Sequence, residues 1–380
     1  MNYILFDDPA IRENLLPLTF TRPVALMRVG ILTIAEKWEK FLNSRVAFFT
    51  ETYLQEKYPL VSGEHNFFIN GAVCPTPELV KEIKKLKEGT TLVHGDVIIA
   101  YKAQPSSKTI PFNKELTVIK NVWDIFVYNG HEIRKDFDLV KGRRSSERIK
   151  DKYTIAYNKK QIFIEKGAKM YGAILNAEQG PIYIGKNTEI GEGAMIRGPF
   201  ALCEGASINM GGKMRGDTTI GPFCKAGGEV SNSVMFAYSS KSHDGFIGNT
   251  VLGEWCNLGA GTTTSNLKNS YGNVQLYNYK NNRLENTGRQ FCGLIMGDHS
   301  KAGINTMFNT ATVVGVSANI FGPGMAGKLV PSFSWGLDGN EKFKLDKVFE
   351  VASRVMERRQ RVLDEVEKRI LAHIYNETKI

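Results

Sequence analysis

From Ile184 to Ile208, an aliphatic residue recurs at every sixth position, through Ile190, Ile196 and Leu202. An amphipathic helix repeats every 3.6 residues and a strand every two, so neither explains this period. A β-solenoid does, because three six-residue faces close one triangular coil around the aliphatic side chains. A single coil cannot bury those side chains alone, so coils must stack on one another. The pattern therefore predicts a stack of parallel β-coils.

The six-residue register continues at Ile220 and Ala226 and then fails twice. It resumes at Leu252 and Leu258, and after a second break it resumes at Ala302. Residues that interrupt the period are expected to leave the coil as loops. Loops on a rigid repeat scaffold commonly carry binding groups. We therefore expect the chemistry of this half of the chain to lie at the two breaks.

The first 150 residues show short apolar runs separated by helical patterns. Strands are predicted at 3–6, 46–50, 67–70 and 91–100, and helices at 31–42 and 76–87. Thr76 suits a helix cap, and Pro77 suits the first helical position. Strands that alternate with helices indicate a three-layer α/β domain over residues 1–150. The stretch 124–138 is interpreted as a polar connection out of this domain, with Asn129-Gly130 as a turn.

The last part of the chain carries one apolar stripe at helical spacing. Its members are Phe343, Val348, Val351, Val355, Val362, Val366, Ile370 and Ile374. Such a stripe predicts a C-terminal helix over 341–376 that packs by one face. It would cover the last coil or meet a neighbouring subunit, because an uncapped solenoid exposes strand edges. The solenoid itself is assigned residues 160–335.

Composition and charge narrow the class of protein. The hydrophobic fraction of 42% and the charged fraction of 23% are typical of a globular protein. The net charge of +10 suits phosphorylated metabolites, nucleic acids or anionic membranes as partners. No nucleic-acid-binding motif accompanies the basic residues, and no apolar run has transmembrane length, so we expect neither nucleic acid nor membrane as a partner.

The cysteines and the N-terminus favour a cytoplasmic location. The five cysteines are scattered and include no Cys-x-x-Cys pair. An odd number without framework spacing favours reduced thiols, which are typical of the cytoplasm. The first eight residues lack the basic start and long apolar run of a signal peptide. We therefore predict a cytoplasmic protein.

The segment 17–30, PLTFTRPVALMRVG, resembles the start of sugar-1-phosphate nucleotidyltransferases. The resemblance implies a nucleotidyltransferase-like, Rossmann-like domain that joins a nucleoside triphosphate (NTP) to a sugar phosphate. It further implies that Arg22 and Arg28 bind phosphate and that Lys37 lies near phosphate or sugar. In-line phosphoryl chemistry needs cations along the triphosphate, which agrees with these residue types.

A second match in this half is His94-Gly-Asp96, which resembles the Gly-Asp pair that holds magnesium in the same family. It implies Asp96 as a ligand of Mg²⁺, a cation that prefers oxygen ligands. The family's Gly-rich phosphate loop is missing, because DDPAIREN stands at 7–14. Glycine lets backbone amides approach phosphates, and this segment offers none. Two possibilities stay open: an active domain, or one that keeps only the fold.

The segment around His243, together with Asn257-Leu-Gly-Ala-Gly-Thr and Asn266, resembles the acetyltransferase site of a bifunctional family. That family is N-acetylglucosamine-1-phosphate uridylyltransferase / glucosamine-1-phosphate acetyltransferase, with the same domain order and a left-handed parallel β-helix. The resemblance implies His243 as general base and Lys241, Asn257 and Asn266 as substrate-binding residues. Arg215 is a further candidate for phosphate. Phe246 stands where the family has tyrosine, which puts the acceptor's identity in question.

The implied partners follow from this resemblance. They are sugar phosphate, NTP and acyl-coenzyme A, with acetyl-coenzyme A as co-substrate and a homotrimer as the assembly. The products would be nucleotide sugars, precursors of cell-envelope polysaccharides. Acyl transfer to an amine needs a base for the amine proton and donors for the developing oxyanion. A histidine suits the first role, and backbone amides of the turn at Gly261 suit the second.

Several functions remain compatible with these residues. Both domains could work, or the solenoid alone could be an acyltransferase, or the first domain alone could act while the solenoid assembles the oligomer. A zinc enzyme on the same scaffold would need three converging histidines. The solenoid supplies only His243 and His299. His299 and Lys301 could instead line a coenzyme groove or simply shape a coil. A non-catalytic scaffold is the last alternative.

Overall fold

The computed structural model describes residues 2–337 and 339–378. By contacts, the chain divides into two compact units. The first comprises residues 1–15, 21–27 and 32–121, and the second comprises 16–20, 28–31 and 122–380. The sequence had placed a boundary at residue 150. The contact boundary falls earlier because the following helix packs on the solenoid.

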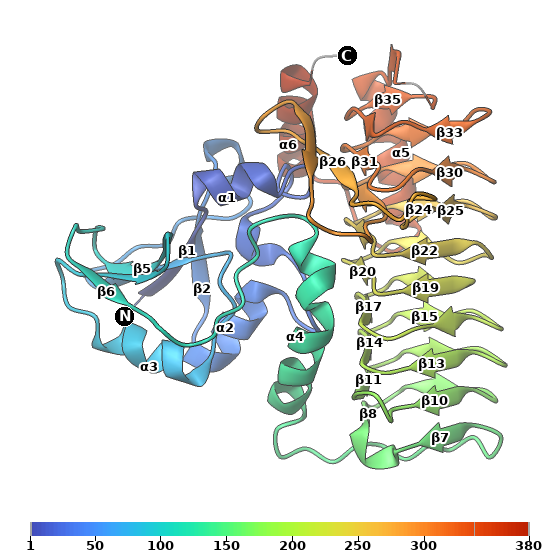
Figure 1. Ribbon diagram of the computed structural model, residues 1–380, viewed down its shortest axis with the longest axis horizontal. Helices are drawn as coiled ribbons and strands as arrows, with labels where there is room; N and C mark the ends of the chain where they lie inside the picture. Colours follow the sequence, from blue (N-terminus) through green and yellow to red (C-terminus); the bar gives the residue numbers. More distant parts are fainter. Residues whose placement is uncertain (1, 338, 379–380) are drawn as a thin grey trace. The chain divides into compact units, whose positions relative to one another are not determined.

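The first unit is an α/β structure built on a six-stranded sheet of order β2-β1-β3-β5-β4-β6 (Figure 1). Strands β1, β2 and β3 run parallel, and β5 runs antiparallel to β3 and β4. Its elements are β1 (Asn2–Phe6), α1 (Pro9–Asn14), η1 (Val24–Leu26), α2 (Ile34–Leu42), β2 (Val46–Phe49), η2 (Thr52–Leu54), β3 (Asn66–Asn70), α3 (Pro77–Lys85), β4 (Thr91–His94), β5 (Val97–Lys102) and β6 (Thr109–Pro111).

Local sequence explains where the helices of this unit begin. Thr33 starts α2 through a capping box with Glu36, so the helix begins three residues later than predicted. Thr76 caps α3 and Pro77 is its first residue, as predicted. The predicted strand 91–100 is a hairpin of β4 and β5, because the chain turns at Gly95 with a φ of 60°.

The predicted connection at 124–138 is wrong: these residues belong to helix α4 (Asp124–Lys141). α4 packs on the solenoid, and the Asn129 side chain donates to the Asp217 carbonyl at 2.8 Å. Gly130 permits this approach, since a Cβ there would lie 1.7 Å from Asp217 Oδ1. The Asn-Gly pair therefore makes a close contact between α4 and the solenoid, and tertiary packing overrides its turn propensity.

The second unit is dominated by a parallel β-helix (Figure 1). Its first face contains β7 (Ile155–Tyr157), β10 (Ile174–Asn176), β13 (Met195–Arg197), β16 (Lys213–Met214), β19 (Glu229–Ser231), β22 (Phe246–Gly248) and then β25 (Thr263–Thr264), β30 (Met307–Phe308) and β33 (Met325–Ala326). Its second face contains β8 (Ile162–Ile164), β11 (Ile182–Ile184), β14 (Phe200–Leu202), β17 (Thr218–Ile220), β20 (Val234–Met235), β23 (Val251–Leu252), β28 (Ile295–Met296), β31 (Val313–Val314) and β34 (Leu329–Val330).

The third face is the longest continuous sheet. It contains β9 (Lys169–Met170), β12 (Glu189–Ile190), β15 (Ser207–Ile208), β18 (Lys225–Ala226), β21 (Ser240–Lys241), β24 (Asn257–Leu258), β29 (Lys301–Ala302), β32 (Asn319–Ile320), β35 (Ser334–Trp335) and β36 (Glu341–Lys342). A short η3 (Lys159–Gln161) precedes β8. Every pairing is parallel except that of β35 with β36, which closes the last coil.

The aliphatic residues of the hexads form the core of the coils, as predicted. Ile184, Ile190, Ile196, Leu202 and Ile208 are all buried in one continuous cluster. Ile190 pairs in register with Ile208, eighteen residues later, which is one coil of three six-residue faces. The fold class predicted from the sequence is confirmed: an α/β N-terminal domain, a left-handed parallel β-helix and a helical C-terminal segment.

The first break in period is not a loop, so that expectation is wrong. Ile220 pairs with Met235, fifteen residues later, and Val230 pairs with Ile247, seventeen residues later. These coils are shorter than eighteen residues, and the chain stays within the stack. The period fails because residues are missing from the turns, while each face keeps its strand.

The second break is a true insertion, as predicted. Val251 pairs with Ile295, so one coil is enlarged by a long excursion. The excursion contains an antiparallel hairpin of β26 (Gln275–Asn278) and β27 (Arg283–Asn286). A bridge between Leu267 and Phe291 closes its base.

The C-terminal segment consists of two helices, α5 (Leu345–Glu357) and α6 (Glu365–Glu377), where the sequence predicted one. Gln360 adopts a left-handed φ of 56° between them, and Asp364 caps α6. α5 buries Val348 and Ala352, which line a small cavity together with Ser317 and Asn319 of the solenoid. The segment therefore covers the upper part of the third face.

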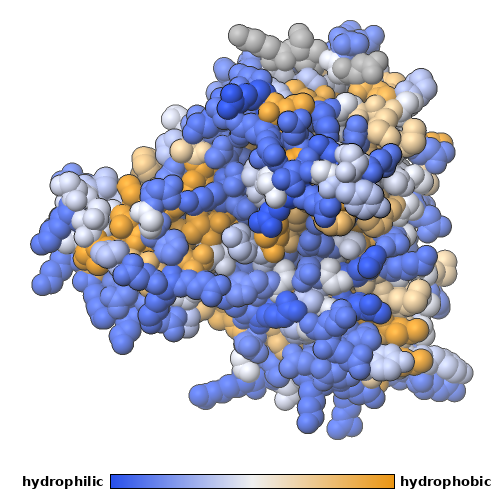
Figure 2. Space-filling model, viewed as in Figure 1, coloured by the Kyte–Doolittle hydropathy of each residue, from blue (hydrophilic) through white to orange (hydrophobic). Residues whose placement is uncertain are grey.

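Within the described ranges, no helix combines the length and apolar character that crossing a membrane would require. Figure 2 shows one face of the molecule, where hydrophilic side chains predominate and hydrophobic patches interrupt them. The five cysteines are all free and buried, which agrees with the predicted reduced thiols.

Candidate functional site

His243 lies in the turn that joins β21 on the third face to β22 on the first face. Its side chain is exposed and lines a groove of about 570 Å³. The other lining residues are Glu189, Gly191, Glu192, Ser207, Ile208, Asn209, Met210, Lys225, Gly228, Ser242 and Asp244. The groove is mostly polar, so it suits a hydrophilic ligand beside an accessible imidazole.

Lys241 holds the backbone of this turn. It is fully buried, and its ammonium donates to the carbonyls of His243 and Asp244. Burial lowers the pKa of Lys241 to about 8. The sequence had assigned Lys241 to substrate binding, but the structure turns its side chain inward. Its role in the fold is to position His243.

A Lys241→Met variant is expected to lower kcat about 10-fold in any reaction that uses the His243 imidazole, because the turn loses two charge-assisted hydrogen bonds. The test is steady-state kinetics alongside circular dichroism, with Lys213→Met on the exposed first face as the matched control.

A second measurement on the Lys241→Met variant is the dependence of its stability on pH. The folded pKa lies below the unfolded value of about 10.4, so wild-type stability should rise between about pH 8 and 10. The variant should lose part of this rise in stability. If both its kcat and its dependence of stability on pH equal those of the wild-type protein, Lys241 does not position His243.

Asn257 and Asn266 lie at different distances from His243. Asn257 is exposed on β24, in register with Ser240 of the coil that carries His243. Asn266 follows β25 and donates to Asn249 Oδ1 at 2.8 Å. Asn249 follows β22, so the three residues of that strand, about 10 Å of extended chain, lie between Asn249 and the turn that carries His243. In one subunit, Asn257 therefore lies on the His243 side of this strand and Asn266 lies on the other side.

Arg215 lies on the same far edge as Asn266, where β16 ends. Its guanidinium is 3.4 Å from Glu229 Oε1, and both side chains are largely exposed. An exposed pair of this kind contributes little to stability, so the arginine can exchange its partner for a ligand. Phe246 occupies the face between the two edges, with its ring close to Gly248 and Asn266.

In the first unit, the position of the missing phosphate loop is filled by helix α1. Asp8 caps this helix by accepting from the amides of Ala10 at 3.0 Å and Ile11 at 3.3 Å. These are the amides that a phosphate would use at a helix N-terminus. The capping carboxylate therefore already occupies the anion-binding end of α1.

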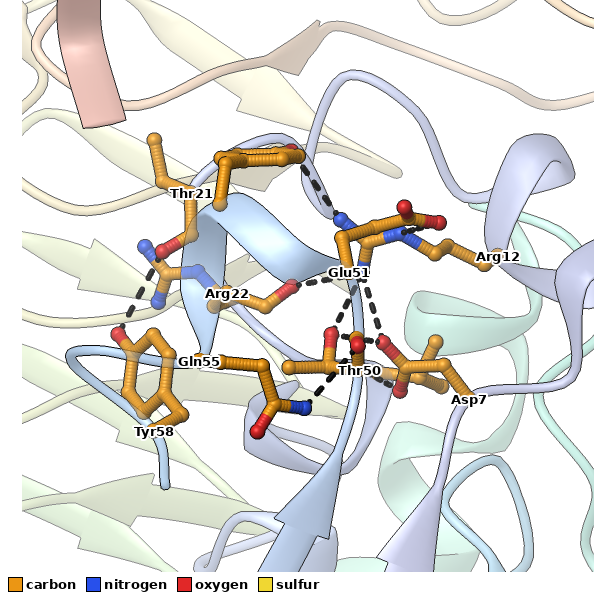
Figure 3. A network of polar contacts seen from close by, with 10 residues as sticks. Asp7, Arg12, Thr21, Arg22, Thr50, Glu51, Gln55 and Tyr58 are labelled. Atoms are coloured by element: carbon orange, nitrogen blue, oxygen red, sulfur yellow. Dashed lines mark hydrogen bonds and ion pairs between the residues drawn. The ribbon is translucent and has the colours of Figure 1, made fainter. Parts of the chain in front are cut away.

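Arg12 of α1 is the centre of a polar network at the carboxyl ends of β1 and β2 (Figure 3). It donates to Asp7 Oδ2 at 2.8 Å, to Tyr53 Oη at 3.3 Å and to the Arg22 carbonyl at 3.2 Å. Thr50 donates to the same Asp7 carboxylate. Burial raises the pKa of Asp7, although the Arg12 charge opposes this rise. The network ties the two strand ends together.

The four residues assigned to phosphate, sugar and metal lie in different surroundings. Arg22 and Lys37 belong to the first unit and are buried. Arg28 is also buried, belongs to the second unit and donates to the Ile31 carbonyl. Asp96 is exposed in the β4–β5 turn, at the same carboxyl edge of the sheet as Asp7. The Asp96 side chain is therefore exposed to solvent, whereas the side chains of Arg22, Arg28 and Lys37 are buried.

Asp96 fits a magnesium site in which the protein supplies few ligands and substrate phosphates supply others. Lys120 lies 2.8 Å from its carboxylate and lowers its pKa. In residues 2–337 and 339–378, no group of three or more His, Cys, Asp or Glu side chains converges on a metal site. Mg²⁺ is often held by one or two carboxylates together with substrate phosphates. Asp96 suits that mode, and the Lys120 ammonium lies beside its carboxylate. The same observation leaves no zinc site of three ligands in these ranges.

The structure gives His299, a candidate from the sequence, three aromatic neighbours that the sequence did not suggest as functional. Phe223, Tyr238, Trp255 and His299 stack their rings at successive corners of the solenoid. Because the coils between these residues are shortened or enlarged, the residues do not recur at a fixed interval, and no periodicity in the sequence reveals them. Arg12 was likewise missed, because only the fold brings it to Asp7 and Tyr53.

Comparison with known proteins gives a family match in the N-terminal part of the chain. Residues 3–145 match the family model described as sugar nucleotidyl transferase. A bifunctional GlmU protein of Methanocaldococcus jannaschii is 34% identical over 87 residues, which are 23% of this chain and 21% of that protein. A bifunctional sugar-1-phosphate nucleotidylyltransferase/acetyltransferase of Sulfurisphaera tokodaii is 33% identical over 93 residues, 24% of this chain and 23% of that protein.

Among solved structures, the UDP-N-acetylglucosamine acyltransferase of Francisella novicida aligns with 59% of this chain and 92% of its own, at 16% identity and a TM-score of 0.25. The matched segments span less than a quarter of the length of the first two curated relatives. The chain thus carries a sugar nucleotidyl transferase match in its N-terminal part and is similar to the bifunctional GlmU-like family, which confirms the resemblance drawn from its motifs.

Proposed function

We propose that this chain is a cytoplasmic transferase of nucleotide-sugar biosynthesis with two activities. The first unit would join NTP and a sugar 1-phosphate, and the solenoid would transfer an acetyl group from acetyl-coenzyme A to an amino sugar. The observation that carries the second activity is the exposed His243 on a turn fixed by Lys241 in a polar groove. The match at 3–145 supports the first activity.

In acyl transfer, the amine nitrogen attacks the thioester carbon. The new C–N bond forms and the C–S bond breaks, which releases coenzyme A as the thiol. His243 would accept the proton that the amine loses and return it to the leaving sulfur. The Gly261 amide, which the sequence suggested as an oxyanion donor, already donates to the Asp244 carbonyl at 3.0 Å, so the developing oxyanion would need a donor from elsewhere in the assembled site. Asn257 would orient the amino sugar.

Because Arg215 and Asn266 lie on the edge opposite His243, a complete acceptor site requires a second copy of the chain. A homotrimer in which this edge of one copy faces His243 of the next would supply both residues. Arg215 would then bind the sugar phosphate and Asn266 would bind the acceptor or the coenzyme. This assembly is part of the proposal and can be checked by analytical ultracentrifugation.

In nucleotidyl transfer, the sugar phosphate oxygen attacks the α-phosphorus of NTP and pyrophosphate leaves. Mg²⁺ bound through Asp96 would supply positive charge beside the phosphates. Arg22 and Lys37 would add to the positive potential around the triphosphate. Helix α1 and the Asp8 carboxylate occupy the position of the missing phosphate loop. This favours a second candidate function, in which the first unit no longer transfers nucleotides and only the solenoid is active. The reverse case, transfer at the first unit with the solenoid as a scaffold, is the third.

Two assays on the intact protein separate these candidates. Thiol release from acetyl-coenzyme A with amino-sugar phosphates reports acyl transfer. Pyrophosphate release from dTTP or UTP with sugar 1-phosphates and Mg²⁺ reports nucleotidyl transfer. Both signals support the two-activity proposal, and thiol release alone supports the acyltransferase. Pyrophosphate release alone supports the scaffold reading, and the loss of both signals with every acceptor removes the proposal.

An Asp96→Asn variant is expected to lower pyrophosphate release about 100-fold, because the neutral amide binds Mg²⁺ weakly. The matched control is Glu115→Gln, which removes an exposed carboxylate elsewhere in the unit. The measurement is the initial rate over a titration of Mg²⁺. An unchanged rate and Mg²⁺ dependence would show that Asp96 is not the ligand.

A further inference from the structure

A second pocket, separate from the His243 groove, lies between the α5–α6 connection and one corner of the solenoid. Its volume is about 400 Å³. Its lining residues are Phe223, Tyr238, Arg358, Arg359, Gln360 and Arg361. Small-molecule sites in proteins start at about 300 Å³, so the pocket has the size of a ligand site. No residue proposed above for either activity lines it.

The wall on the solenoid side is a stack of aromatic rings. The centroids of Phe223 and Tyr238 are 5.1 Å apart, and those of Tyr238 and Trp255 are 4.1 Å apart, with planes within 9°. The three residues have positive φ values near 60°, which aligns them at successive corners. Gly205 lies beneath Phe223 and leaves its ring room. The stack is rigid, and Phe223 and Tyr238 present part of their surface to the pocket.

The opposite wall is strongly basic. Arg358, Arg359 and Arg361 lie within four residues and form no ion pair inside the described part of the chain. The Arg361 guanidinium lies 5.8 Å from the centre of the Tyr238 ring. The neighbouring acids are Glu357 and Asp364, and the Asp364 carboxylate caps α6 by accepting from Glu367. Three unpaired like charges repel one another, so a bound anion would stabilise this connection.

We propose that this pocket binds a phosphorylated nucleoside. Guanidinium groups match phosphate oxygens in bidentate geometry, and three of them suit more than one phosphate. Planar bases pack against aromatic side chains and guanidinium planes. The pocket combines both features, whereas an inorganic anion would use only the arginines. The ligand class is therefore a nucleoside that carries at least one phosphate.

Two sources could supply this chemistry. Tyr238 precedes His243 by five residues across the third face, which allows a separation of at most about 17 Å. Coenzyme A carries a phosphorylated adenosine at one end of a long flexible chain and its thiol at the other. Its adenosine end could bind here while the thioester reaches His243, and this source rests on the proposed acyl transfer. The other source is a free nucleotide, which requires no acyl transfer.

The test is isothermal titration calorimetry of the full chain with adenosine 3′,5′-bisphosphate, UDP and inorganic phosphate. The variant is the triple change Arg358→Gln, Arg359→Gln and Arg361→Gln. Its control changes the exposed lysines Lys159, Lys160 and Lys166 to glutamine, so both proteins lose three positive charges. Binding of at least one nucleotide should weaken 10-fold or more in the first variant only. Equal melting temperatures would show that both variants fold.

The outcomes separate this site from the proposed acyl transfer. Tighter binding of adenosine 3′,5′-bisphosphate, with a raised KM for acetyl-coenzyme A and unchanged kcat in the arginine variant, supports coenzyme A as the source. Arginine-dependent binding of UDP, or of the bisphosphate without thiol release by wild-type protein, supports a free nucleotide and would stand if the acyltransferase proposal failed. Equal binding by both variants, no nucleotide binding, or phosphate binding as tight as nucleotide binding would overturn the inference.

Discussion

Replacing His243 by alanine is expected to lower thiol release from acetyl-coenzyme A by about 100- to 10,000-fold, the range typical for loss of a general base. The physical reason is that the reaction loses the imidazole that would accept the amine proton, and the neighbouring Asp244 carboxylate is a much weaker base. Lys241 is turned inward and donates to the turn's own carbonyls. The measurement is the initial rate at saturating acetyl-coenzyme A and acceptor. The loss should fall mainly on kcat, since His243 acts in the proton transfer.

The matched control is His65→Ala, which removes an exposed histidine from the first unit. Its rate should equal that of wild-type protein. A His243→Gln variant keeps the size and polarity of the side chain but cannot act as a base near neutral pH, so it should be as slow as the alanine variant. Full activity in either His243 variant would reject the base assignment and leave the groove as a binding site only.

Replacing Gly221 by alanine should produce the largest loss of stability. Gly221 follows the last strand of the second face before the shortened coil, and a Cβ there would lie 1.6 Å from the Phe236 carbonyl oxygen. The next coil is only fifteen residues long, so its backbone cannot move aside without disturbing the register of Ile220 with Met235. Overpacking typically costs about 1–3 kcal/mol in the free energy of unfolding, and a clash with backbone atoms belongs at the upper end of this range.

The test is urea unfolding followed by circular dichroism, with Gly327→Ala as the matched control in the same solenoid. Gly327 has an ordinary φ, and its nearest neighbour would lie 3.9 Å from an added Cβ. That variant should unfold at the wild-type midpoint. Equal midpoints for both variants would mean that the coil at Gly221 relaxes around the added methyl group. The close approach of Gly221 to the Phe236 carbonyl would then contribute nothing to the free energy of unfolding.

The sequence predicts the solenoid well because its signal is local and repeated. Each inward aliphatic residue occupies a position fixed by its own coil, so Ile184 to Ile208 could be assigned without knowledge of distant contacts. α4 could not be predicted in this way. Its Asn129-Gly130 pair is a strong turn signal, and the helix forms there because Asn129 and Gly130 contact Asp217 across the fold.

The same distinction applies to the candidate site. The family resemblance suggested His243 and Asn257 as candidates, and the structure places them on neighbouring coils. The inward orientation of Lys241 could not be predicted, because a lysine in a coil normally faces water and only the short turn beside it supplies carbonyls to bind. The arginine pocket depends on a break between α5 and α6 that one continuous apolar stripe concealed.

The stacking of the coils also affects how disturbances spread along the molecule. Each coil bonds only to the one before and the one after it, so the solenoid resembles a linear chain of coupled units. A local opening at the Gly221 coil would interrupt the backbone ladder between two shorter blocks, which α4 would still connect through its contacts with β14, β17 and β20. The lower block would keep the regular hexads, and the upper block would keep the hairpin and the C-terminal helices. The coil with the fewest residues is therefore the natural boundary between two folding units inside one continuous β-helix.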